Sequence, residues 1–151
     1  MSLKSPGAKK VIAAFEQAVK KHRRTKGCCF DFAVIAKELG FKAEWHAGAS
    51  RRPIYISKKL GLVVKRPYVS EERDLYRKSK YKIPTNIIDV KDEVDRESDS
   101  PSPIYIQPLA DVSKKAVKIA LETFDGVKHG FYDDHDKNIG LYNGKPVIFD
   151  W

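Results

Sequence analysis

Residues 139–149 read IGLYNGKPVIF, two short apolar segments joined by Asn143-Gly144. Asn-Gly between such segments is the strongest short sequence signal for a two-residue β-hairpin turn. The pattern predicts strands over Ile139–Tyr142 and Lys145–Phe149. Since a hairpin returns the chain beside itself, we expect Asn138 and Asp150, just outside the strands, to be neighbours. Cross-strand Cα atoms in such a ladder lie roughly 4.5–5.5 Å apart.

Oxygen-bearing side chains crowd the loop just before this hairpin. Residues 133–136 read DDHD, and Asn138 and Asp150 flank the predicted strands. Mg²⁺ prefers one or two carboxylates, with water and phosphate as its other ligands. The sequence therefore predicts a divalent-cation site at this edge of the hairpin. The alternative is a polar turn followed by an ordinary hairpin.

The wider segment makes this pattern more specific. YDDHDKNI at residues 132–139, followed by the hairpin and a closing Phe-Asp-Trp, resembles the catalytic loop and metal-binding hairpin of the aminoglycoside-phosphotransferase branch of the protein-kinase-like superfamily. The resemblance implies that Asp133 accepts or orients the proton of a substrate hydroxyl and that His135 braces the loop. It also implies that Asn138 and Asp150 hold Mg²⁺ on the phosphates of ATP.

The resemblance also implies an ATP-binding lobe earlier in the chain. Residues 48–50 form a glycine-containing turn, so Gly48 and Ser50 are expected beside the phosphates. Lys65 ends the apolar segment at residues 61–65 and is expected to be the phosphate-binding lysine. The alternative for Lys65 is a surface lysine at the end of a strand.

Three further cofactor contacts follow from the same resemblance. The family pairs its phosphate-binding lysine with a glutamate from the next helix, and Glu72 is preferred over Glu71 for that role. The backbone from Gln107 to Leu109 is expected to meet the edge of the adenine ring. The implied cofactors are ATP and Mg²⁺, and the implied acceptor is a hydroxyl of a protein or a small molecule.

Apolar periodicity elsewhere predicts a mixed α+β fold. Repeats of three and four residues predict helices, and two-residue alternation predicts strands. The expected helices are residues 8–22, Asp31–Leu39, a weak one at Glu71–Lys80, and Val112–Phe124 with Asp111 or Ser113 as its cap; the expected strands are a meander over residues 41–66, then Asn86–Val90 and Ile104–Gln107.

These elements predict a protein-kinase-like α+β fold: a small antiparallel β-sheet lobe, then a reduced helical lobe with a catalytic-loop hairpin. The expected domains are a helical segment at residues 1–40 packed on the lobe, an ATP-binding β-rich lobe at 41–110 and a reduced C-lobe at 111–151. The family usually has two helices before the catalytic loop and more helices after the metal-binding aspartate. We therefore expect a minimal member or a chain that continues, with a catalytically inactive kinase-like binding module as the alternative to an active phosphotransferase.

Composition favours an ordinary globular domain. The 151 residues include 42% hydrophobic and 32% charged side chains, and no apolar stretch approaches the roughly eighteen residues that span a membrane. No signal-peptide pattern is present, so we expect a cytoplasmic protein without a membrane partner. The formal net charge is +9. A basic nucleic-acid-binding protein using Lys20–Lys26 is the less favoured alternative, because aromatic residues are not interleaved with that basic run.

Overall fold

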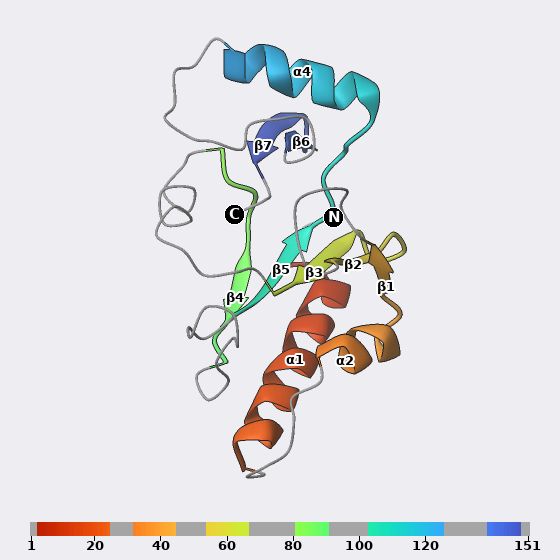
Figure 1. Cartoon of the computed structure of the whole chain (residues 1–151), viewed down its shortest axis with the longest axis vertical. Coiled ribbons are helices and arrows are strands. Elements are labelled where there is room, and N and C mark those ends of the chain that lie inside the picture. Colours follow the sequence, from red (N-terminus) through yellow and green to blue (C-terminus); the bar gives the residue numbers. More distant parts are fainter. Residues whose placement is uncertain are drawn as a thin grey trace. The chain divides into compact units, whose positions relative to one another are not determined.

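The computed structural model describes residues 3–24, 32–44, 54–66, 81–90, 103–125 and 139–148 of the chain. In these ranges the fold is mixed α+β, with three helices, a five-stranded antiparallel sheet and a two-stranded antiparallel hairpin (Figure 1). The chain divides into two compact units, residues 1–69 with 85–108 and residues 70–84 with 109–151.

The first unit contains two helices and the five-stranded sheet. Its elements are α1 (Pro6–Arg24), α2 (Phe32–Glu38), β1 (Lys42–Glu44), β2 (Ile54–Ser57), β3 (Leu62–Lys65), β4 (Asn86–Ile88) and β5 (Ile104–Pro108). The strand order is β1-β2-β3-β5-β4, and every neighbouring pair is antiparallel. The predicted meander over residues 41–66 is confirmed, and β3 and β5 are the strands that join it to the rest of the sheet.

Local chemistry explains where the two helices of this unit begin and end. The Ser5 hydroxyl accepts a hydrogen bond from the Ala8 amide (3.2 Å), so Ser5 caps α1. Pro6 occupies the first helical position, where the N–H group that proline lacks would have no partner within the helix. Helix α1 therefore starts two residues before the predicted one. Gly40 has a φ of +90° after α2, the left-handed conformation that ends many helices.

Helices α1 and α2 cover one face of the sheet and share its core (Figure 1). The Phe15 ring of α1 lies 5.5 Å from that of Phe32 in α2, and Phe32 meets Tyr55 of β2 edge-on at 5.3 Å. From the sheet, Val64 and Ile106 contribute to the same cluster and are fully buried. The amphipathic pattern of α1 is thus satisfied by burial against the strands.

The second unit contains α4 (Lys114–Asp125), β6 (Ile139–Tyr142) and β7 (Lys145–Ile148). The Ser113 hydroxyl accepts a hydrogen bond from the Ala116 amide (3.3 Å), and the Asp111 carboxylate accepts one from the Ser113 amide (2.9 Å). Both predicted capping residues therefore act, and the helix starts at Lys114 rather than Val112. Helix α4 packs against both strands of the hairpin (Figure 1).

Candidate functional site

The sheet of the first unit has a second face, opposite to the helices. Residues two apart on a strand point to the same side, and directly paired residues of neighbouring strands share a side. Val64 of β3 pairs with Ile106 of β5, and both belong to the helix-covered core. Their neighbours Lys65 and Tyr105 therefore lie on the opposite face, which we call the lysine face.

Two rows of side chains cross the lysine face. The register pairs Lys65 with Tyr105 and Tyr105 with Ile87, which makes one row. Val63 pairs with Gln107 and with Ile56, which makes the other row. Adjacent strands are roughly 4.8 Å apart, and rows two residues apart along a strand are separated by about 6.7 Å.

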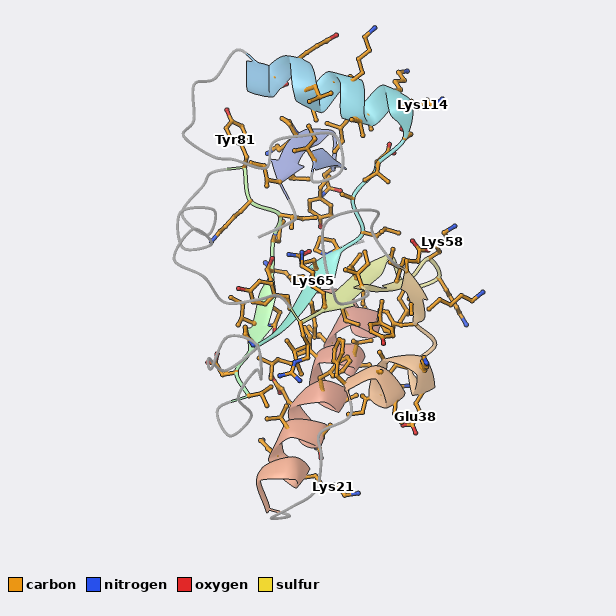
Figure 2. The ribbon with its side chains drawn as sticks, in the orientation of Figure 1. Lys21, Glu38, Lys58, Lys65, Tyr81 and Lys114 are labelled. Atoms are coloured by element: carbon orange, nitrogen blue, oxygen red, sulfur yellow. The ribbon has the colours of Figure 1, made fainter. Side chains whose placement is uncertain are left out.

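Lys65 is buried at the end of an inner strand. It is 8% exposed, and its strand lies between β2 and β5. Figure 2 shows Lys65 among the strands, while Lys58, in the turn after β2, points away from the sheet. A lysine is almost never this buried unless its ammonium group is paired, because removing the charge from water is costly. The surface-lysine alternative is therefore wrong for Lys65.

Gln107 is the other strongly buried polar side chain of the lysine face. It is 2% exposed, and its Nε2 donates a hydrogen bond to Oγ1 of Thr85 at 3.1 Å. Asn86 pairs with Ile106 in the antiparallel ladder of β4 and β5. The next residues along the ladder, Thr85 and Gln107, therefore lie opposite each other in the same row. Thr85 is not among the predicted site residues, because nothing in the local sequence shows that β4 becomes a neighbour of β5.

The hairpin of the second unit has the predicted turn. Asn143 and Gly144 have φ values of 51° and 75°, as a type I′ turn requires at both central positions. The strands pair from Tyr142 with Lys145 out to Ile139 with Ile148. That outer pair ends the described part of the hairpin.

Backbone hydrogen bonds brace both edges of this hairpin. On one edge, the Ile83 amide donates to the Ile148 carbonyl (2.9 Å), and the Ile148 amide donates to the Tyr81 carbonyl (2.7 Å). On the other, Asp111 and Leu141 exchange two bonds of 2.7 and 3.0 Å. The hairpin strands are therefore held on both sides by chain that is distant in sequence.

Asp111 carries the one resolved pKa shift among the described groups. The Ser113 backbone amide, and secondarily the Ser113 side chain, donate hydrogen bonds that lower the pKa of the Asp111 carboxyl, while desolvation opposes this weakly. Because Asp111 is fully exposed and serves the cap of α4, we assign its shift to helix capping rather than to chemistry.

The predicted site residues are only partly within the described ranges. Lys65 and Gln107 lie together on the lysine face, whereas Leu109 is half-buried in the second unit. The other predicted site residues lie outside the described residues: Gly48, Ser50, Glu71, Glu72, Asp133, His135, Asn138 and Asp150. Within the ranges that are described, no group of three or more His, Cys, Asp or Glu side chains could hold a metal ion.

Comparison with protein-family models, curated proteins and solved structures finds no match to this chain. None of the described helices is both long and apolar enough to cross a membrane.

Proposed function

We propose that this chain is an ATP- and Mg²⁺-dependent phosphotransferase of the protein-kinase-like superfamily, which transfers the γ-phosphoryl group to a hydroxyl of a protein or small molecule. The observation that carries the proposal is the burial of Lys65. A lysine selected from the sequence as a phosphate ligand is 8% exposed on an inner strand, on the face that the two helices leave uncovered. A buried cation of this kind suits an anionic ligand such as a phosphate group.

The hairpin supports the metal half of the proposal. Asn138 directly precedes Ile139, and Asp150 follows Ile148 by two residues; Ile139 and Ile148 pair across β6 and β7. We expect Asn138 and Asp150, just beyond this outer pair, to lie near each other. An amide oxygen and a carboxylate suit Mg²⁺, which takes its other ligands from phosphate and water. Bound there, Mg²⁺ would neutralise charge on the transferred phosphate.

The proposed reaction assigns one task to each side chain. Lys65 binds ATP phosphate oxygens, with Glu72 as its expected partner, and the turn at Gly48 and Ser50 lies beside the phosphates. The acceptor hydroxyl oxygen forms a bond to the γ-phosphorus while the bond from that phosphorus to the ADP oxygen breaks. Asp133 takes the hydroxyl proton, and His135 braces the loop that holds Asp133.

Incubation of the full chain with Mg²⁺ and γ-labelled ATP tests this function. We expect ATP turnover or self-labelling in the wild type and its loss in Asp133→Ala. Asp134→Ala is the matched control, because it removes the neighbouring carboxylate, which has no role in the proposal. Equal activity of wild type and Asp133→Ala would refute the catalytic assignment. Nucleotide binding by the wild type without turnover would leave the inactive binding module as the better description.

A further inference from the structure

The turn of the hairpin presents an asparagine directly before a glycine. Asn143 and Gly144 are both exposed, in the turn between β6 and β7. The chain has two other asparagines, Asn86 and Asn138, and each of them is followed by isoleucine. A side chain that branches at Cβ crowds the backbone beside it, whereas glycine has no Cβ and leaves its own nitrogen unhindered. Asn143 is therefore the asparagine whose side chain the next backbone nitrogen can reach most easily.

This pair of residues can undergo deamidation, in which the chain itself supplies the nucleophile. The backbone nitrogen of Gly144 forms a bond to Cγ of Asn143, and the bond from Cγ to Nδ2 breaks. Nδ2 leaves as ammonia with the proton of the Gly144 amide, and a cyclic succinimide remains. Water then adds to either ring carbonyl and breaks its bond to the ring nitrogen. The net change is the loss of ammonia and the gain of water.

The products of this reaction differ in the path of the backbone. Opening of the ring at Cγ leaves aspartate, and Asp-Gly favours the same turn as Asn-Gly. Opening at the backbone carbonyl leaves isoaspartate, in which the chain runs through Cβ and Cγ and gains a carbon atom. The register of a hairpin depends on the length of its loop. Isoaspartate at position 143 should therefore break the pairing of Tyr142 with Lys145.

The folded turn opposes ring closure. Asn143 has a φ of 51°, and the left-handed region has a ψ of about +30 to +60°. At such a ψ the Gly144 nitrogen is nearly anti to Cβ of Asn143 about the Cα–C bond, whereas ring closure requires the two atoms to be nearly eclipsed. The turn must therefore open locally before the nitrogen can reach Cγ.

We propose that Asn143 is a deamidation site, reached when the hairpin opens locally, and that its isoaspartyl product prevents the turn from re-forming. The turn lies close to Leu141, whose amide and carbonyl exchange hydrogen bonds with Asp111, and α4 packs against both strands. Loss of the turn therefore affects contacts that hold the second unit together. Neither nucleotide nor metal takes part, so the reaction is independent of the proposed function.

Ageing of the full chain in mildly alkaline buffer, followed by peptide mapping and mass spectrometry, tests the site. Carboxyl should replace carboxamide at Asn143 while Asn86 and Asn138 remain unchanged. Electron-transfer fragmentation distinguishes aspartate from isoaspartate, and both should appear. In guanidinium chloride that unfolds the chain, conversion at Asn143 should be at least about tenfold faster, which corresponds to a local opening free energy of about 1.4 kcal/mol. An intact Asn143 after ageing, equal conversion at Asn86, or equal rates for the folded and unfolded chain would overturn the proposal.

Hydrogen exchange separates the effects of the two products. The isoaspartyl form, purified from the aged protein, should exchange the Leu141 amide faster than the unmodified protein does. Asn143→Asp reproduces the other product and should exchange like the wild type. Asn143→Gly is the matched control for ageing, because Gly-Gly favours the same turn and has no carboxamide to close the ring. The proposal fails if the isoaspartyl form exchanges like the wild type, or if ageing speeds exchange equally in Asn143→Gly.

Discussion

A Cβ atom on Gly140 would lie 2.5 Å from the carbonyl oxygen of Asp111, closer than real side chains come to a backbone atom. The same carbonyl accepts a hydrogen bond from Leu141, and the Asp111 amide donates one back. Two backbones distant in sequence therefore touch at a point where β6 can carry no side chain. This contact joins the segment before α4 to the hairpin whose far end leads to the proposed metal ligands.

Gly140→Ala should destabilise the second unit by about 1–3 kcal/mol. The added methyl group meets a backbone oxygen, which can move aside only by breaking its hydrogen bonds with Leu141. Chemical unfolding measures the loss. Hydrogen exchange at the Leu141 amide should speed up in the same variant.

Gly144→Ala is the matched control for this prediction. A Cβ there meets open space, but its φ of +75° is strained for a side chain, so a cost of about 1–2 kcal/mol is expected. In Gly144→Ala, hydrogen exchange at the Leu141 amide should speed up only as much as the lower overall stability requires. If Gly140→Ala is as stable as the wild type, the close approach of Gly140 to Asp111 is wrong.

The cap of α4 should give the second unit a dependence on acidic pH. Hydrogen bonds from Ser113 lower the pKa of Asp111 below its usual 3.8. A carboxyl whose pKa is lower in the folded state stabilises that state above its unfolded pKa, and the contribution is lost as the pH falls through the folded pKa. When thermal stability is measured from pH 5 downward, protonation of Asp111 should therefore account for part of its loss, below about pH 3.8.

Asp111→Asn separates this effect from general acid unfolding. The amide oxygen of asparagine can still accept the hydrogen bond from the Ser113 amide, but the side chain does not titrate. The variant should show a shallower loss of stability over the same pH range. Identical pH profiles for the wild type and Asp111→Asn would mean that this carboxylate contributes nothing to the cap.

The parts of this fold that follow from short sequence signals could be predicted. Asn143-Gly144 fixes its turn because both positions need positive φ, and Gly40 ends α2 for the same reason. The earlier start of α1 was also readable, since Ser5 followed by Pro6 is a capping signal in its own right. In each case neighbouring residues decide the conformation.

The pairing of distant segments could not be predicted in the same way. That β5 lies between β3 and β4 depends on which strand edges meet after folding, which no local pattern records. The hydrogen bond from Gln107 to Thr85 and the contact of Gly140 with Asp111 are consequences of such pairings. The two-residue alternation along residues 104–108 predicts that Tyr105 and Gln107 share a face of the sheet. It does not predict that Lys65, on another strand, lies beside them.

Phe15 should be essential to the first unit. Its ring is fully buried and packs between α1, α2 and the sheet. Phe15→Ala should cost about 3–5 kcal/mol of unfolding free energy, because it leaves a cavity that the two helices cannot close fully. Gln17→Ala, on the exposed side of the same helix, should change stability by no more than about 0.5 kcal/mol. Equal stabilities of the two variants in urea would show that α1 does not belong to this core.

Lys65 should be required for binding ATP and should also contribute to folding. Lys65→Met keeps a long apolar stem on the lysine face but removes the charge. Because the buried Lys65 makes an interaction in the folded protein, its loss should lower the stability of the ligand-free protein rather than raise it. Lys58→Met is the control, since Lys58 is an exposed lysine in the turn between β2 and β3, at the opposite end of β3 from Lys65. With Mg²⁺-ATP at about a hundred times the dissociation constant, the wild type and Lys58→Met should gain roughly 2.7 kcal/mol of stability. Lys65→Met should gain far less, because the phosphates lose their buried cation. A full ATP-dependent gain in Lys65→Met would show that the buried ammonium group does not bind phosphate, and would remove the observation on which the proposed function rests.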